Sequence, residues 1–444
     1  MKKLLLVVAI LFATSMLFAQ TNTSDVNSVG YNNNSDVVQA GLTNLSDVDQ
    51  IGDENASTVD QTGISNNSVV LQAGGGPSGD GSSDFNTSDI DQLGESNYSF
   101  IWQDGDYNMN TTFQDGNSNY SYVDQWGYGS TSETYQNGNS NSSTVLQGYG
   151  TVNGYHYSYV DQRGDENVSY VKQYGGDWND SYVFQEGNNN DAYAEQNGNS
   201  NNSDIWQIGD LNDSDVNQTG DENWGQNEQI GDRNISDIDQ DGNRNYAGAG
   251  QYGNSNNSSI DQDGDDNYAL TFQIGNRNGS MVAQVGNEND SFVNQDGDFN
   301  KSCVTQIGDL NISRVTQIGT WNKSGVEQIG DLNRSYVNQN GFGNASCVGQ
   351  YGDENISYVD QDGTFNLSGV LQTGDRNFST VTQNGLLNIS CVDQTGLDHY
   401  SLVNQQGNFN WSKVQQFGND HDSVVNQIGN SNSSTVTQTD SLPF

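Results

Sequence analysis

The chain has 444 residues, of which 31% are apolar and 16% charged, and it contains 52 glycines but only 2 prolines. This composition excludes a conventional large hydrophobic core, and it also differs from Pro-rich disordered chains. The formal net charge of −44 arises from 57 acidic against 13 basic residues, which excludes a basic surface for nucleic acid or anionic lipid. The polar residues must therefore take part in a regular structure.

The first residues have the features of a secretory signal peptide, which we expect to span residues 1–19. Lys2 and Lys3 precede an apolar stretch, and Ala19-Gln20 is a plausible cleavage point. The apolar stretch is too short to cross a bilayer, and no later window of 18 residues is apolar, so we expect no membrane span. The sequence therefore predicts an exported chain.

From about residue 22 onward, the chain repeats with a period of eleven residues. Glutamine occupies every eleventh position from Gln185 to Gln438, and the same frame continues upstream to Gln39. Three insertions interrupt the upstream part, near residues 73–85, 148–155 and 174–178. We therefore expect a repeat domain over residues 20–438, followed by a tail of residues 439–444.

Each repeat unit has the form Q-x-G-x-x-N-x-S-x-V-x, as in Gln306, Gly308, Asn311, Ser313 and Val315. The Asn, Ser, Val and Gln positions alternate with variable positions, which is typical of a β-strand with one fixed and one solvent-facing side. Glycine permits a positive φ in the G-x-x-N turn, and Asn can bond to its own backbone there. The turn glycines that we single out are Gly308, Gly319 and Gly330.

The inward Gln and Asn side chains need partners, because each unsatisfied buried amide costs about 1–3 kcal/mol. An identical residue stacked about 4.8 Å away supplies that partner and forms the amide ladder of cross-β structures. Since one unit buries a single Val, stability must come from stacking. The expected ladder and assembly residues include Gln306, Asn311, Ser313, Val315, Gln317, Asn322, Ser324, Gln328, Gln339, Gln350 and Gln361.

Outward residues indicate that one coil contains two units. An acidic residue follows the turn glycine every 22 residues, at Asp309, Asp331, Asp353 and Asp375, and the intervening units lack it. The predicted fold is therefore an all-β solenoid of strand-turn-strand coils of about 22 residues, with two facing parallel sheets. The 36 Gln-anchored units correspond to about 18 coils. We expect the four Asp to act as charge gatekeepers that keep the subunit soluble, with calcium binding as the alternative.

The repeat units resemble the curlin repeat family, the subunits of curli amyloid fibres on Gram-negative bacterial surfaces. The family pattern Q-x-G-x-x-N-x-[AS], followed by another Gln, matches nearly every unit, for example Gln317, Gly319, Asn322, Ser324 and Gln328. The resemblance implies a secreted structural protein of extracellular, pilus-like fibres, active in biofilm matrix, adhesion and surface colonisation. It also implies two partners, a curli-type nucleator and an outer-membrane secretion apparatus.

The cysteines share one outward position. Cys303, Cys347 and Cys391 are 44 residues apart, or two coils, which separates their Cα atoms by roughly 9–10 Å. A disulfide needs less than about 7 Å, so we expect free surface thiols, with lateral cross-links between fibres as the alternative.

Histidine replaces the turn Asn in three units, at His156, His399 and His421. Two stacked His do not make a metal-ligand set, so we expect them to substitute structurally for Asn. The N-x-S sequons that the repeat creates, such as Asn311-Ile312-Ser313, are expected to face inward rather than to carry glycans.

No catalytic, cofactor or metal motif is apparent in the repeat, so the sequence predicts no enzyme and no cofactor. We expect the solenoid ends to be uncapped and to join head to tail with other copies, which is a contact that does not close and gives fibres. The alternatives are a monomeric β-solenoid surface adhesin or an ice-binding protein. An ice-binding face requires regular Thr, whereas the position before each Gln varies, as in Thr305, Glu327 and Asp360.

Overall fold

The computed structural model describes residues 21–73, 84–149 and 154–440, so the expected signal peptide lies outside the described residues. Every regular element in these residues is a β-strand, which confirms the all-β prediction. The chain divides into two compact units, Met1–Asp177 and Trp178–Phe444, which follow the same plan.

The first unit contains β1 to β13. Their bounds are β1 Thr23–Val29, β2 Asn34–Leu42, β3 Leu45–Ile51, β4 Ala56–Ile64, β5 Asn67–Ala73, β6 Thr87–Glu95, β7 Tyr98–Asp106, β8 Met109–Asn117, β9 Tyr120–Tyr128, β10 Thr131–Asn139, β11 Ser142–Tyr149, β12 Tyr157–Arg163 and β13 Val168–Tyr174.

The second unit contains β14 to β37. Their bounds are β14 Asp180–Glu186, β15 Asp191–Asn197, β16 Asn202–Ile208, β17 Asp213–Thr219, β18 Trp224–Ile230, β19 Ile235–Asp241, β20 Tyr246–Tyr252, β21 Asn257–Asp263, β22 Tyr268–Ile274, β23 Gly279–Val285, β24 Asp290–Asp296, β25 Lys301–Ile307, β26 Ile312–Thr320, β27 Lys323–Ile329, β28 Arg334–Phe342, β29 Ala345–Tyr351, β30 Ile356–Thr364, β31 Leu367–Thr373, β32 Phe378–Leu386, β33 Ile389–Leu397, β34 Tyr400–Asn408, β35 Trp411–Asn419, β36 Asp422–Ile428 and β37 Ser433–Thr439.

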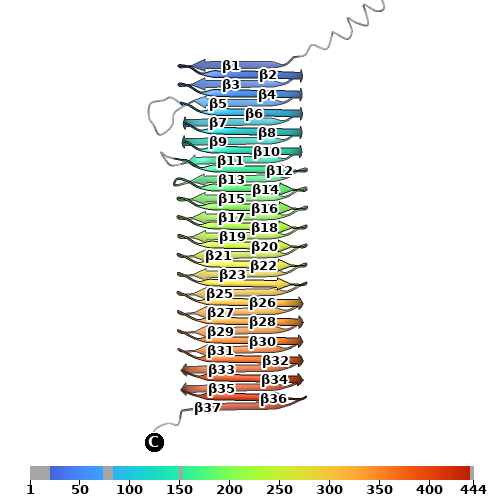
Figure 1. The fold of residues 1–444 in the computed structure, drawn as a ribbon, viewed down its shortest axis with the longest axis vertical. Helices are drawn as coiled ribbons and strands as arrows, with labels where there is room; N and C mark the ends of the chain where they lie inside the picture. The colour runs from blue at the N-terminus through green and yellow to red at the C-terminus, as the bar shows by residue number, and fades with distance from the viewer. Residues whose placement is uncertain (1–20, 74–83, 150–153, 441–444) are drawn as a thin grey trace, which may run out of the picture. The chain divides into compact units, whose positions relative to one another are not determined.

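Within each unit, every strand pairs in parallel with the next strand but one, so the odd-numbered strands form one sheet and the even-numbered strands form the other (Figure 1). In the second unit the paired residues are 22 apart, as in Gln317 opposite Gln339 and Gln306 opposite Gln328. One coil therefore consists of two eleven-residue units, and the 37 described strands correspond to about 18 coils, which confirms the predicted solenoid.

Two upstream insertions leave glutamine paired with glutamine, although β11 has a register shift against β13 just after Gln147. The paired glutamines Gln61 and Gln92 are 31 residues apart, and Gln136 and Gln162 are 26 apart, but Gln still lies opposite Gln. The extra residues therefore lie between strands of the first unit and do not change which side chains face inward.

The turns explain the strict glycine position of the repeat. Gly330 has a φ of 115°, and a Cβ there would lie 2.3 Å from the carbonyl oxygen of Gly352 in the next coil. Glycine is needed both for its conformation and because the backbones approach closely. The turn also holds a residue with positive φ directly before Asn, such as Leu332 with a φ of 60°. This second left-handed position is filled by many residue types, so the sequence gives no sign of it.

In most coils, each of the two facing strands contributes one inward valine to the apolar core between the sheets. Val315, Val337 and Val359 are buried in successive coils, and buried Ser and Gln flank them along each strand. The variable residues of the strands alternate with these and face outward. The apolar core is thin, so the polar rows beside it must satisfy their own hydrogen bonds.

Candidate assembly interface

Within each unit, the inward glutamines of both sheets form amide ladders. Gln317 Nε2 donates to Gln339 Oε1 at 2.8 Å, and Gln339 Nε2 donates to Gln361 Oε1 at 2.8 Å. The second hydrogen of Gln317 Nε2 goes to the backbone oxygen of Lys301 in the facing sheet, at 2.9 Å. Each glutamine therefore joins neighbouring coils and also ties the two sheets together.

The turn asparagines form a second ladder, and its hydrogen bonds have a fixed direction. The backbone N–H of Asn333 donates to Asn311 Oδ1 at 3.0 Å, and Asn333 Nδ2 donates to the carbonyl of Gly352 at 2.7 Å. The bond to its own backbone that the sequence suggests occurs in some units, as from Asn322 Nδ2 to the carbonyl of Ile318 at 3.1 Å. Contacts between coils are thus the general rule for this position.

The structure places the singled-out ladder residues on the inner side of the coils. All of them are buried, and Gln306, Gln328 and Gln350 form the ladder of the odd-numbered sheet as Gln317, Gln339 and Gln361 form that of the even-numbered sheet. The sequons are buried with them, since Asn311 and Ser313 are both 0% exposed. A buried Asn side chain cannot carry a glycan in the folded protein.

The inward serines behave differently from the amides. Ser313, Ser335 and Ser357 are buried in adjacent coils, and their Oγ atoms make no hydrogen bond to any described residue. A serine hydroxyl is shorter than a glutamine amide, and it reaches the next coil only in some places, as from Ser203 Oγ to Ser181 Oγ at 3.0 Å and from Ser412 Oγ to Ser390 Oγ at 3.3 Å. Most of the buried serine hydroxyls are therefore packed without a hydrogen-bond partner among the described residues.

The singled-out aspartates have a structural role that the sequence did not reveal. The backbone N–H of Asp309 donates to Asp331 Oδ1 at 2.9 Å, and Asp331 N–H donates in the same way to Asp353, and Asp353 to Asp375. Asparagine serves equally well upstream, since the N–H of Asn254 donates to Asn276 Oδ1. The position therefore requires a short side-chain oxygen, and charge is not essential to it.

The turns that follow the even-numbered strands β26 to β32 lack these aspartates, and the strands themselves are longer there. At the equivalent position, β26, β28, β30 and β32 carry Thr320, Phe342, Thr364 and Leu386, and these strands extend two residues further than the seven-residue strands of the facing sheet. Backbone pairing connects these strands at Thr320 and Phe342, whereas the N–H of Leu386 again donates to a side-chain oxygen, Asn408 Oδ1, at 3.0 Å.

The histidines occupy asparagine positions in the turn. The rings of His399 and His421 stack with centroids 5.3 Å apart, and His399 Nδ1 lies 3.3 Å from the backbone nitrogen of His421, where Asn Oδ1 would accept. Burial lowers the pKa of the third histidine, His156, to about 4. All three are therefore structural substitutes for Asn, as their positions predict.

Crowded carboxylates line the outer face of the second unit. Burial, together with the charges of Asp213 and Asp237, raises the pKa of Asp215 to about 6. Burial and the neighbouring Asp261 also raise the pKa of Asp239 and of Asp237. These three carboxyl groups thus resist ionisation, because they are partly buried and lie close to other carboxylates.

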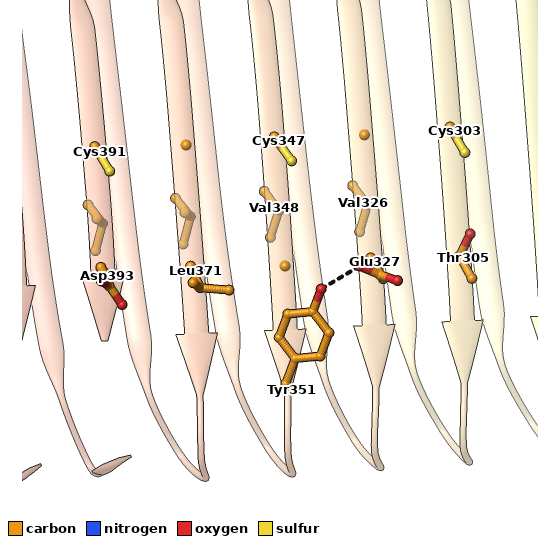
Figure 2. Close-up of a pocket in the computed structure, with 15 residues that line it drawn as sticks. Cys303, Thr305, Val326, Glu327, Cys347, Val348, Tyr351, Leu371, Cys391 and Asp393 are labelled. Atoms are coloured by element: carbon orange, nitrogen blue, oxygen red, sulfur yellow. Dashed lines mark hydrogen bonds between the residues drawn. The ribbon is translucent and has the colours of Figure 1, made fainter. Parts of the chain in front are cut away.

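The three cysteines lie in a groove on the outer face of the odd-numbered sheet of the second unit. Figure 2 shows Cys303, Cys347 and Cys391 in one row, on β25, β29 and β33. Gly325 and Gly369 occupy the row between them, and the resulting groove has a volume of about 540 Å³. All three thiols are free, and burial raises the pKa of Cys303 and Cys391.

One wall of this groove carries the tyrosine-carboxylate pair in Figure 2. The hydroxyl of Tyr351 on β29 donates to Glu327 on the neighbouring strand β27, and this hydrogen bond raises the pKa of Tyr351. A Cβ at Gly325 or Gly369 would meet no atom within 4 Å, so packing does not require glycine there.

Strand edges are open at the first and last coils of the described residues. All of β1 is exposed, including Val26 at 45%, whereas the equivalent valines of inner coils are buried. Among the described residues, Gln39 Oε1 accepts no hydrogen bond, and Gln438 Nε2 donates only to the backbone of Asp422. The ladder of the even-numbered strands in the first unit thus begins with an acceptor, and the ladder of the odd-numbered strands in the second unit ends with a donor.

Among the described residues, no cluster of three or more His, Cys, Asp or Glu has the arrangement to hold a metal ion. The described part of the chain also has no helix of the length and hydropathy that membrane crossing requires.

Parallel coils that are joined by amide ladders and have open strand edges define a structural β-solenoid, whose coils stack on one another. The family model of the curlin associated repeat matches residues 187–220, 231–264, 264–297, 314–341, 337–363 and 358–385. The chain thus carries curlin associated repeats between residues 187 and 385. Family and fold are those of a curli-like structural protein rather than of an enzyme, and the family is associated with extracellular curli fibres. No curated protein matches the chain.

Proposed function

We propose that this protein is a secreted subunit of extracellular curli-like amyloid fibres, which serve biofilm matrix, adhesion and surface colonisation. The observation that carries the proposal is the pair of open edges, at β1 and β2 and at β36 and β37, with unpaired ladder groups of opposite kind. Open parallel edges recruit further strands, and a donor end that meets an acceptor end gives a polymer that does not close.

The acidic surface fits a subunit that must stay soluble until it assembles. A net charge of −44 disfavours contact between copies at low ionic strength, and salt screens that repulsion. A nucleator and a secretion apparatus complete the proposed setting, by analogy with the family.

The direct test is polymerisation of the purified chain lacking residues 1–19, followed by thioflavin fluorescence, sedimentation and electron microscopy. Fibres whose diffraction shows the spacings of about 4.7 and 10 Å support the proposal. Because a monomeric solenoid has the same spacings, sedimentation must show that the fibres grow with protein concentration.

An edge-blocked variant gives the matched control. Thr437 is an exposed residue of β37, and the parallel pattern directs its N–H to the open edge, so Thr437→Pro removes a donor without touching the inner coils. We expect Thr437→Pro to slow growth about tenfold or more and Thr437→Val to leave it nearly unchanged. A soluble rod that never polymerises would instead favour a monomeric adhesin or an ice-binding protein.

A further inference from the structure

The open ends of the described coils have the form of a step. Each strand pairs with the next but one, so β37 lies half a coil beyond β36, and β1 lies half a coil before β2. Two free edges of different height are therefore present at each end, and any second copy must fit both at once.

We infer that consecutive copies join with a half-turn about the fibre axis, so that β1 of the next copy pairs with β36 and β2 of the next copy pairs with β37. This inference rests on the proposed polymerisation. The resulting register continues the repeat without a gap: Ser423 lies opposite Ser24, Val425 opposite Val26, Ser434 opposite Ser35, Val436 opposite Val37 and Gln438 opposite Gln39.

The alternative without a half-turn leaves a hole in one sheet. If β1 of the next copy paired with β37, then β2 would lie roughly 9–10 Å from β36, which is two strand spacings instead of one. The open backbone groups of β36 and β2 would then face a missing strand. Unpaired backbone groups at a buried joint cost about 1–3 kcal/mol each, so the half-turn arrangement is strongly favoured.

The ladder directions fix which ends can meet. Throughout the second unit, Gln Nε2 donates toward the later coil, as from Gln416 to Gln438 at 2.9 Å. The free Nε2 hydrogen of Gln438 therefore meets the unused Oε1 of Gln39 of the next copy. Two first coils brought together would instead place carbonyl oxygen against carbonyl oxygen.

The asparagine ladder selects the same head-to-tail joint, although its backbone N–H groups donate toward earlier coils rather than later ones. The N–H of Asn432 donates to Asn410 Oδ1 at 3.0 Å, which leaves Asn432 Oδ1 without a donor among the described residues. In the proposed register it faces the backbone N–H of Asn33 of the next copy, which has no acceptor in the described chain. Two independent ladders thus select the same head-to-tail joint.

Cysteine cross-linking separates the two registers. In a background with Cys303, Cys347 and Cys391 changed to Ser, the variant Asn27→Cys is mixed with Asn426→Cys or, as the matched control, with Thr437→Cys. Asn27, Asn426 and Thr437 are exposed and occupy the same place within their strands, on β1, β36 and β37 respectively.

Mixed fibres are grown in reductant, washed and oxidised with diamide, which takes up the two thiol hydrogens as the sulfur–sulfur bond forms. The half-turn register places residue 27 of the next copy about 4.8 Å from residue 426, within disulfide range. We expect the Asn27→Cys and Asn426→Cys mixture to give about tenfold more cross-linked dimer than the control mixture.

Each other outcome overturns a different statement. Fibres that cross-link through residue 437 refute the half-turn, and fibres that cross-link residue 27 to itself refute the head-to-tail joint. If neither mixture sediments as fibres while the parent chain also stays soluble, the proposed function itself fails.

Discussion

At the residue scale, the buried polar side chains of this solenoid are of two kinds. Some have hydrogen-bond partners, and others have none among the described residues. Gln339 bonds to the coil before, the coil after and the facing sheet, whereas Ser335, four residues earlier in the same strand, bonds to no described residue. The two side chains are equally buried. Their contributions to stability should therefore differ in sign.

A matched pair of variants in β28 tests this difference. Gln339→Leu keeps the volume but leaves Gln361 Oε1 without a donor and one hydrogen of Gln317 Nε2 without an acceptor, so we expect a loss of about 2 kcal/mol or more. Ser335→Ala removes an unsatisfied hydroxyl and should leave stability unchanged or raise it by up to about 1 kcal/mol. Hydrogen exchange of β26 to β30 measures both, because stacked repeats open locally. Equal losses in the two variants would contradict this assignment.

Asp331 allows the hydrogen-bonding role of the turn column to be separated from its charge. Asp331→Asn keeps the oxygen that accepts from Asp309 N–H and removes repulsion from the adjacent carboxylates, so stability should hold or rise. Asp331→Ala loses the acceptor, and we expect a loss of about 1 kcal/mol. Thermal unfolding checks this: we expect the Asn variant to be at least as stable as the wild type, and the Ala variant to be the least stable.

The same two variants test the gatekeeper hypothesis through the lag time of assembly. If the charge of Asp331 restrains assembly, both variants shorten the lag to a similar degree at low salt, and the difference vanishes at high salt. Unchanged lag times would leave the column with its structural role alone.

At the element scale, the glycines of the repeat fall into two groups that sequence alone does not separate. Gly330 sits in a turn against the backbone of the next coil, whereas Gly325 sits on a strand and faces the open groove. Gly330→Ala should therefore destabilise its coil by about 2 kcal/mol or more, and Gly325→Ala should be tolerated within about 0.5 kcal/mol.

Denaturation and labelling of the neighbouring thiols report this contrast. The Gly325→Ala chain should unfold like the wild type but with slower labelling of Cys303 and Cys347, because the new methyl group partly fills the groove between them. The reverse order of stability would mean that the strand glycine has a packing role that its open surroundings do not show.

The acidic strand β17 gives a pH dependence whose sign follows from its raised pKa. Burial and neighbouring carboxylates raise the pKa of Asp215 from 3.8, the ordinary value of an aspartate, to about 6 in the folded chain, so between these values the folded chain binds more protons than the unfolded chain. Stability then falls as the pH rises from about 4 to about 6. We expect the protection factors of the β17 amides, which correct for the pH dependence of intrinsic exchange, to be higher at pH 4.5 than at pH 7.

Asp215→Asn mimics the protonated acid and serves as the control. In this variant β17 should stay protected at pH 7, and part of its pH dependence should disappear, while the contributions of Asp237 and Asp239 remain. A pH profile identical to that of the wild type would show that Asp215 does not titrate in this range.

Much of this structure could be predicted from the sequence, because a strict period makes every side chain its own stacking partner. The alternation around Gln317 gave the strand and its inward face, and the spacing of Asp309 and Asp331 gave the two-unit coil. The acceptor role of Asp331 and the left-handed turn residue Leu332 could not be predicted, because both depend on how closely two coils approach. The groove between the cysteines likewise exists only once the sheet is assembled.

At the scale of the whole molecule, the ladders give the solenoid a polarity that its almost uniform coils would otherwise lack. Every Gln bond in the second unit points toward later coils, and the backbone N–H groups of the turn asparagines donate toward earlier ones. A chain built in this way has a donor end and an acceptor end for each ladder. Growth by addition of identical copies then needs no further specificity element.

One position in the first coil breaks the glutamine ladder where the proposed joint forms. β1 carries Ser28 at the Gln position, and its Oγ donates to Gln50 Oε1 at 3.0 Å. In the proposed register Ser28 faces Gln427 of the preceding copy. The Gln427 amide must then bond to a serine side chain, which is shorter than the glutamine it meets elsewhere in the ladder. Ser28→Gln should complete the ladder, and one amide bond worth about 1 kcal/mol lowers the critical concentration for fibre growth about fivefold.

The critical concentration is measured as the monomer that remains after sedimentation, with Asn27→Gln as the control because residue 27 faces outward on the same strand. The control should leave the value unchanged, since an outward amide adds nothing to the inner ladder. A higher critical concentration for Ser28→Gln would indicate that the serine is needed to accommodate the joint. It would thereby place the limiting contact of fibre growth at the first strand rather than along the ladder.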